Sequence, residues 1–180
     1  MMGRMMYSGR FIRVEEEEIG GYTFEKAYLK DSLIIIPFID RERLLLIEER
    51  RIHEDVKVRL KPIGGFFESG YSLAENANRE LQEEIGMRAG RIVPYATAKR
   101  SGTLNDTVHL VLAFDLIAAP VPNPDPNEEI LAVVPVTVSD AYRMALAGRF
   151  GMGYSGYFVL KLWHDWQAGR IGPGMEEIEL

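Results

Sequence analysis

Two runs of hydrophobic positions, residues 33–39 and 44–49, stand out in the first third of the chain, with a charged tetrapeptide between them. Apolar runs of this length are typical of strands that are buried on both faces. Residues 10–30 instead alternate apolar and polar positions around a Gly20-Gly21 turn, which predicts an N-terminal β-hairpin. The later strand patterns cover residues 91–100, 107–118 and 130–138.

The clearest helix pattern covers residues 72–85. Ser72 is a suitable N-cap, Glu75 completes a capping box, and Gly86 follows the last helical position. We therefore expect the helix to begin and end at these residues.

Two more helices are expected near the end of the chain. Ser139-Asp140 offers a cap to a helix over residues 141–148, and residues 155–169 form the second. In the second helix Phe158, Leu162 and Trp166 recur at helical spacing, which assigns them to packing rather than to ligand stacking.

Strands of a mixed sheet with helices on either side predict an α/β fold with α/β/α layers. The length of 180 residues allows one domain with a substantial core. We divide the chain into an N-terminal strand extension (1–30), the domain itself (31–172) and a C-terminal tail (173–180).

Composition excludes several classes of function. The chain has no cysteine, so disulfides, thiolate nucleophiles and cysteine-bound zinc are excluded. A net charge of −6 disfavours binding to nucleic acid or to an anionic membrane surface. No apolar run approaches the ~20 residues of a membrane span. We expect a protein of the cytoplasm that binds neither nucleic acid nor membrane.

Three carboxylates share one face of the helix over residues 72–85. Glu80, Glu83 and Glu84 lie three and four positions apart and would repel one another without a cation among them. A solvated acidic face is the alternative, but only Arg79 is nearby on the helix as a partner. Several carboxylate oxygens suit Mg²⁺ or Mn²⁺ rather than zinc or copper.

A glycine-rich loop precedes these carboxylates. Gly64-Gly65 and Gly70 let the backbone approach a ligand where a side chain would intrude. A glycine loop that leads into an acidic helix predicts a site for a metal ion and a diphosphate.

Residues 65–87 resemble the signature of the Nudix hydrolases, G-x5-E-x7-R-E-U-x-E-E-x-G-U, where U is a bulky aliphatic residue. Gly65, Arg79-Glu80-Leu81, Glu83-Glu84 and Gly86-Met87 match it, whereas Tyr71 stands in place of the first glutamate. The resemblance implies a Nudix-type α/β/α sandwich. Because the missing glutamate supports the loop and the arginine in that family, we expect Tyr71 to reduce or retune activity rather than abolish it.

The resemblance also implies roles for these residues. Glu80, Glu83 and Glu84 would bind the metal, with the Gly65 carbonyl as a further ligand, and Arg79 would orient the carboxylates. We assign Glu83, Glu84 and Arg79 to catalysis and Gly64 to substrate binding.

Residues 44–52, 99–116 and 127–150 resemble the ADP-ribose and ADP-sugar pyrophosphatase branch in order and spacing. This resemblance implies a nucleoside diphosphate-sugar as substrate. It also implies a homodimer that is paired through the N-terminal strands. Arg100-Ser101-Gly102-Thr103 departs from the Ser-Pro-Gly stretch of that branch. Leu60-Lys61-Pro62 stands where a glutamate often precedes the signature. Both departures concern substrate recognition more than metal binding.

Three residues outside the signature resemble site residues of the branch. Glu128 and Glu129 stand where the general base is often found, with Glu129 the candidate base and Glu128 a candidate substrate contact; solvated loop acids are the alternative. Arg51 resembles a phosphate-contacting arginine, and a structural salt bridge is its alternative.

Two other patterns are set aside. Residues 151–156 match G-x-G-x-x-G but lack the preceding strand of a dinucleotide site, so a flexible loop is expected there. His53, His109 and His164 have no metal-ligand spacing.

The function implied is a metal-dependent pyrophosphohydrolase that cleaves a nucleoside diphosphate linked to another moiety, with ADP-ribose or an ADP-sugar as the expected substrate and AMP and a sugar phosphate as products. The alternative, prompted by Tyr71, is a Nudix-fold module that binds a nucleotide-sugar without hydrolysing it.

Overall fold

The computed structural model describes residues 3–51, 54–121, 129–150 and 153–171. Within these ranges the chain forms the strands β1 (Arg4–Ser8), β2 (Ile12–Ile19), β3 (Tyr22–Leu29), β4 (Ser32–Pro37), β5 (Arg43–Arg50), β6 (Val58–Lys61), β7 (Met87–Arg100), β8 (Leu104–Ala118) and β9 (Glu129–Thr137). The helices are α1 (Leu73–Ile85), α2 (Val138–Leu146) and α3 (Tyr154–Gln167). None of the described helices is long and apolar enough to cross a membrane.

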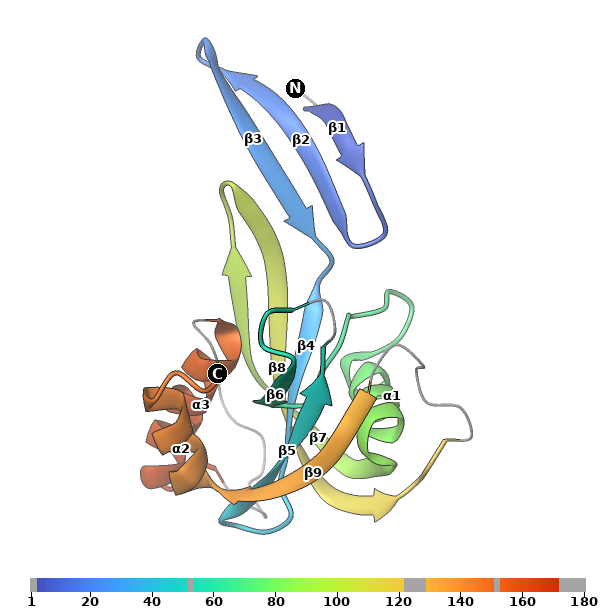
Figure 1. Cartoon of the computed structure of the whole chain (residues 1–180), viewed down its shortest axis with the longest axis vertical. Helices are drawn as coiled ribbons and strands as arrows, with labels where there is room; N and C mark the ends of the chain where they lie inside the picture. The colour runs from blue at the N-terminus through green and yellow to red at the C-terminus, as the bar shows by residue number, and fades with distance from the viewer. Residues whose placement is uncertain (1–2, 52–53, 122–128, 151–152, 172–180) are drawn as a thin grey trace.

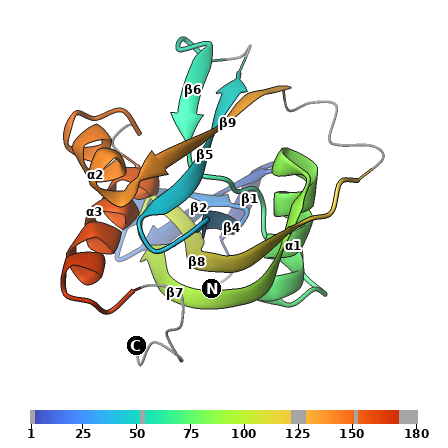
Figure 2. The ribbon, with the colours of Figure 1, turned by 90° about the horizontal axis from the view of Figure 1, so that it is seen from below.

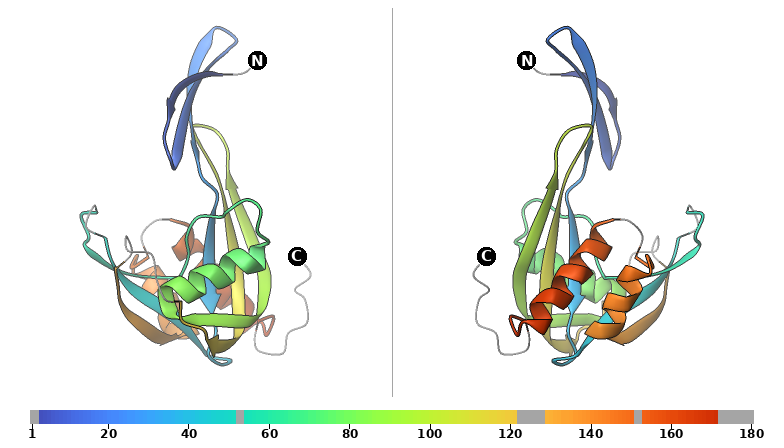
Figure 3. Two further views of the ribbon diagram at one scale, coloured as in Figure 1. Left: turned by 90° about the vertical axis from the view of Figure 1, so that its right-hand side faces the viewer. Right: turned by 90° about the vertical axis from the view of Figure 1, so that its left-hand side faces the viewer.

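The strands form two sheets that are covered by helices on opposite sides. The larger sheet has the order β1-β2-β3-β8-β4, with β7 paired to β8, and the smaller one has the order β6-β5-β9. Strands β4 and β8 are parallel whereas β7 and β8 are antiparallel, so the larger sheet is mixed. Helix α1 lies on one side of the strands and α2 and α3 lie on the other (Figures 2 and 3). The predicted α/β fold with a mixed sheet is confirmed.

Strand β4 shows why a continuous apolar run predicted a buried strand. Leu33 and Ile35 pack in a cluster with Leu81 of α1, whereas Ile36 packs in a second cluster with Phe158 of α3. Neighbouring side chains of a strand point to opposite faces, so both faces of β4 must be apolar. Helix α3 packs as expected too, because Phe158 and Leu162 are fully buried and Trp166 packs against the same cluster.

Three expectations about elements were wrong or incomplete. Strands β1 and β6 were not predicted from the sequence. Helix α2 begins at Val138 with Thr137 as its N-cap, because the Thr137 hydroxyl accepts the Asp140 amide at 3.0 Å. Tyr154, Ser155 and Gly156 are the first residues of α3 and not a flexible loop, while residues 151–152 lie outside the described ranges.

The N-terminal hairpin was predicted correctly but is extended by β1. These three strands project away from the rest of the molecule (Figure 1), and β3 joins the sheet through a short parallel pairing with β8. Many of their large apolar side chains are exposed: Met5, Met6, Tyr7, Ile12, Ile19, Tyr22 and Phe24.

A network of charged groups ties α3 to β7. Asp165 accepts hydrogen bonds from the Tyr95 hydroxyl, from Lys161 Nζ at 2.6 Å and from Arg170 Nη2 at 2.6 Å. Burial alone would raise the pKa of the Asp165 carboxyl, but these three donors outweigh burial and lower the pKa well below its usual value. The charged form of Asp165 therefore stabilises the folded chain.

Replacing Asp165 by Asn should lower the free energy of unfolding at pH 7 by about 3 kcal/mol, because Lys161 and Arg170 lose their charged partner. A carboxyl whose folded pKa is depressed stabilises the fold above its unfolded pKa, about 3.9, and loses this effect as pH falls through the folded value. The difference between wild type and Asp165→Asn in urea unfolding should thus shrink below about pH 4. Asp115→Asn, in an exposed ion pair, is the control; an equal loss in both variants would contradict the assignment.

Candidate active site

Helix α1 carries its polar side chains at both ends and along one buried stripe. At its start the Ser72 hydroxyl accepts the Glu75 amide at 3.2 Å, and the Glu75 carboxylate accepts the Ser72 amide at 2.7 Å, so the expected capping box is present. Gly86 ends the helix with φ 64°. Both predicted ends of this helix are confirmed.

The buried polar stripe follows a spacing of four residues. Asn76, Glu80 and Glu84 are only 1%, 4% and 5% exposed. Residues four apart on a helix lie above one another on the same face. Buried polar groups need partners, and the partners of these three side chains define the site.

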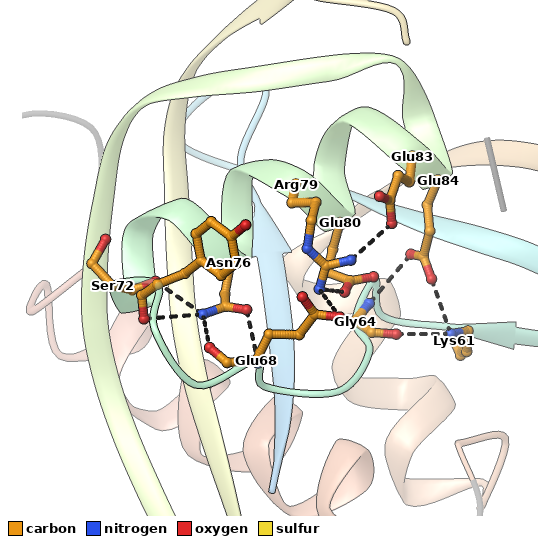
Figure 4. Close-up of polar contacts among 10 residues, drawn as sticks. Lys61, Gly64, Glu68, Ser72, Asn76, Arg79, Glu80, Glu83 and Glu84 are labelled. Atoms are coloured by element: carbon orange, nitrogen blue, oxygen red, sulfur yellow. Dashed lines mark hydrogen bonds and ion pairs between the residues drawn. The ribbon is translucent and has the colours of Figure 1, made fainter. Parts of the chain in front are cut away.

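Arg79 holds two of the predicted metal ligands (Figure 4). Its Nη2 donates to Glu80 Oε1 at 2.7 Å and its Nη1 donates to Glu83 Oε2 at 3.1 Å. Burial lowers the pKa of the Arg79 guanidinium, but the charges of the neighbouring glutamates outweigh it, so the pKa is raised and the side chain stays charged. The guanidinium fork fixes both carboxylates in place.

Lys61, the last residue of β6, holds the third carboxylate. Its Nζ lies 3.4 Å from Glu84 Oε1 and 3.5 Å from the Gly64 carbonyl oxygen (Figure 4). The Gly64 amide donates to Glu84 Oε2 at 3.2 Å. The same ammonium lies 3.0 Å from Glu49 Oε2 of β5. Glu84 is therefore bound from two sides, by a cation and by the backbone of the glycine loop.

The paired glycines bring the loop against the carboxylates. A Cβ atom at Gly65 would lie 2.6 to 2.7 Å from the carboxylate atoms of Glu80, and one at Gly64 would lie 2.1 Å from the Leu33 carbonyl oxygen. Only glycine fits at position 64, because the clash there is with backbone, whereas a side chain at position 65 would displace the Glu80 carboxylate. The Gly65 carbonyl accepts the Leu33 amide at 2.9 Å, whereas the Gly64 carbonyl faces Lys61. The Gly65 carbonyl as a metal ligand stays a prediction.

Asn76 supports the loop that contains Tyr71. Its Oδ1 accepts the Glu68 amide at 3.0 Å, and its Nδ2 donates to the carbonyl oxygens of Glu68, Tyr71 and Ser72 at 3.1, 3.3 and 3.1 Å. Glu68 Oε1 also lies 4.0 Å from Arg79 Nη2. The Tyr71 residue itself is 55% exposed. The missing glutamate was expected to support the loop and the arginine. In this structure Asn76 supports the loop, and Glu68 lies near Arg79.

Replacing Tyr71 by Glu should therefore change kcat/KM by less than about fivefold, since surface ion pairs are worth at most ~1 kcal/mol. The added carboxylate would find the loop already held by Asn76 and the arginine already paired. Steady-state kinetics on the purified variant check this. A gain of more than tenfold would restore the expectation that Tyr71 limits activity.

Two of the remaining predicted residues are described: Arg51 directly follows β5, and Glu129 is the first residue of β9. Arg51 Nε lies 3.0 Å from Glu49 Oε2, so the salt-bridge alternative for Arg51 is realised. Glu129 pairs with Arg50 across the two strands at 3.3 Å, and both side chains are largely exposed. Among the described residues no contact joins Glu129 to the glutamates of α1. Glu128 lies outside the described ranges.

The oxygen-rich donor set suits a divalent ion. Glu80, Glu83 and Glu84 offer carboxylates on one helix, and the close approach of Gly65 leaves no side chain between the loop and Glu80. Nowhere in the described part of the chain do three acidic or histidine side chains converge as a ligand cluster. In this structure the partners of the three carboxylates are Arg79 and Lys61.

A separate cavity of about 990 Å³ lies between β7 and α3 and is not part of this site. Its polar lining includes Lys99, Arg100, Tyr154 and Lys161. None of the glutamates of α1 borders it.

Sequence reasoning missed Glu49, Glu68 and Asn76. Asn76 could have been found from its spacing of four with Glu80 and Glu84. Glu49 and Glu68 carried no such signal, because they reach the site through the pairing of β5 with β6 and through the loop conformation.

Comparisons with known proteins agree with this geometry. The sequence model of the NUDIX domain matches residues 29–153. Among solved structures, the crystal structure of ADP compounds hydrolase is similar to this chain with a TM-score of 0.72 and 20% identity, covering 95% of this chain and 98% of that one. No curated protein sequence matches the chain. At this identity the structural likeness concerns the fold.

Proposed function

Because this chain belongs to the NUDIX domain family, and is a Nudix pyrophosphohydrolase, we propose that it hydrolyses ADP-ribose or an ADP-sugar to AMP and a sugar phosphate. The observation that carries the proposal is the buried set of Glu80 and Glu84, with Glu83 beside them, against the Gly64-Gly65 loop. The fold shared with an ADP compounds hydrolase supports an ADP-containing substrate.

We propose Mg²⁺ or Mn²⁺ as the cofactor, held by Glu80, Glu83 and Glu84. When bound, such an ion neutralises negative charge on a diphosphate and activates water for attack on phosphorus. Arg79 orients the Glu80 and Glu83 carboxylates through its two hydrogen bonds. The glycine loop would let its backbone approach a diphosphate without an intervening side chain.

Glu129 is the proposed general base, and Arg51, Gly64 and Glu128 are the proposed substrate contacts. Glu129 is exposed next to Arg50, so it is accessible to water at the edge of β5 and β9. Arg51 would contact a phosphate from its position beside Glu49. These roles predict that Glu129→Gln lowers kcat more than it raises KM.

A panel of nucleoside diphosphate compounds tests the proposal. We expect the fastest release of AMP from ADP-ribose or an ADP-sugar in the presence of Mg²⁺. The alternative function is a nucleotide-sugar sensor, which the exposed Tyr71 in the signature first suggested. Tight binding in calorimetry without turnover of any compound would establish the sensor and refute the hydrolase.

We also propose that the chain forms a homodimer through β1–β3 and acts in the cytoplasm. The exposed apolar side chains of these strands are suited to a second copy of the chain. Light scattering after size exclusion should give a dimer for wild type and a monomer for the double variant Tyr22→Lys, Phe24→Lys. A monomeric wild type would contradict this. The cysteine-free sequence supports the cytoplasm.

A further inference from the structure

Lys61 Nζ lies among three oxygen atoms, which is more than an ion pair with a single carboxylate supplies. Its Nζ lies 3.0 Å from Glu49 Oε2, 3.4 Å from Glu84 Oε1 and 3.5 Å from the Gly64 carbonyl oxygen. The Lys61 side chain is only 19% exposed. Two carboxylates and a backbone carbonyl are the ligand types that a divalent ion takes.

Lys61 and Arg51 are held against the Glu49 carboxylate by charge attraction more than by hydrogen bonds. Glu49 is 3% exposed, and both Lys61 Nζ and Arg51 Nε lie 3.0 Å from its Oε2. Neither contact has hydrogen-bond geometry, since this oxygen is buried without a hydrogen-bond partner in the described part of the chain. The ammonium therefore acts on Glu49 as a compact point charge.

We propose that Lys61 is a built-in cation of the active site, which takes the place of one divalent ion between Glu49 and Glu84. An ammonium and a divalent ion repel each other and compete for the same oxygens, so both cannot occupy this position. Divalent ions are then left to Glu80, Glu83 and the Oε2 side of Glu84, because Lys61 contacts Glu84 through Oε1. The inference rests on the proposed metal-dependent function and specifies how many ions the site takes.

The two cations of the site differ in what they can do for a substrate. Arg79 is a planar fork that is already bound to two carboxylates, whereas Lys61 has three donors on a flexible stem at the edge of the glycine loop. Lys61 can thus keep its contact with Glu49 and offer a further donor to an anionic oxygen. A fixed ammonium supplies charge without depending on the metal concentration.

Counting bound Mn²⁺ by electron paramagnetic resonance tests the proposal without any assay of activity. The variants are Lys61→Met, which keeps the apolar stem, and Lys61→Glu, which adds a carboxylate. Lys61→Glu should bind one more Mn²⁺ ion per chain than wild type. Lys61→Met should bind Mn²⁺ at least about tenfold more tightly than wild type, because one nearby positive charge is removed.

Lys99→Met and Lys99→Glu are the matched controls. Lys99 is exposed on β7 and borders the cavity beside α3. Its two substitutions change the net charge of the chain by the same amounts as the substitutions of Lys61. Both controls should retain the wild-type number and affinity of Mn²⁺ ions. Circular dichroism confirms that each variant is folded, and Lys61→Met remains informative if Lys61→Glu does not fold.

The outcomes separate the two claims. Equal numbers and affinities of Mn²⁺ in wild type and in both Lys61 variants would overturn the inference and leave Lys61 as a structural ion pair, with the hydrolase proposal intact. Failure of every protein to bind Mn²⁺ would overturn the metal-dependent function itself. An extra ion in Lys61→Glu but not in Lys99→Glu supports the inference.

Discussion

Replacing Glu84 by Gln is expected to lower kcat/KM for ADP-ribose by about 10³-fold. A bound metal ion contributes several kcal/mol of charge stabilisation to the transition state. Each 1.4 kcal/mol that is lost lowers the rate about tenfold. The amide keeps the shape of the side chain and can still accept the Gly64 amide. It carries no charge, so it can neither balance Lys61 nor hold a divalent ion. Steady-state kinetics with Mg²⁺ give the comparison.

Glu25→Gln is the matched control for this variant. Glu25 lies on β3, far along the chain from the glycine loop and α1, and undergoes the same chemical change. It should retain wild-type kinetics. Near wild-type activity in Glu84→Gln would remove Glu84 from the proposed metal ligands.

Replacing Asn76 by Ala should have the second largest effect. Four hydrogen bonds between Asn76 and the loop of Glu68, Tyr71 and Ser72 are lost. The free energy of unfolding should fall by about 2 kcal/mol, because partly buried backbone groups lose their partners. We expect kcat/KM to fall by a further factor of about 10 to 100, as for residues that orient metal ligands. Asn76 acts here as a positioning residue.

Asn78→Ala separates the positioning effect from a loss of stability. Asn78 accepts the Ala89 amide at 2.8 Å and so contributes to the same helix without touching the loop. It should lower stability while leaving kcat/KM within a few-fold of wild type. Hydrogen exchange at the Glu68 amide should accelerate in Asn76→Ala alone. Equal kinetics in both variants would show that the Asn76 contacts are structural only.

The ends and the faces of the main helix could be predicted from local sequence. Capping by Ser72 and Glu75 and the stop at Gly86 depend on neighbours within a few residues, and all three are present. The buried strands were also predictable, because an apolar run needs cover on both faces. The start of helix α2 was predicted three residues too late, because both Thr137 and Ser139 are acceptable caps and the end of β9 selects Thr137.

The partners of the acidic residues could not be predicted in the same way. Lys61 reaches Glu49 and Glu84 through the antiparallel pairing of β5 with β6, and that register is a property of the whole sheet. The sequence also does not show that Asn76 supports the loop of Tyr71. The expected effect of Tyr71 on activity stays a prediction, which the kinetics of Tyr71→Glu test.

Release of AMP from ADP-ribose, measured before and after removal of divalent ions, tests the central claim most directly. The same sample is treated with a chelator and then supplied with excess Mg²⁺, beside Glu84→Gln as the inactive reference. The account predicts equal amounts of AMP and ribose 5-phosphate from wild type, no release in chelator, and full recovery with Mg²⁺. Unchanged release in chelator, or no release from wild type under any condition, would contradict it.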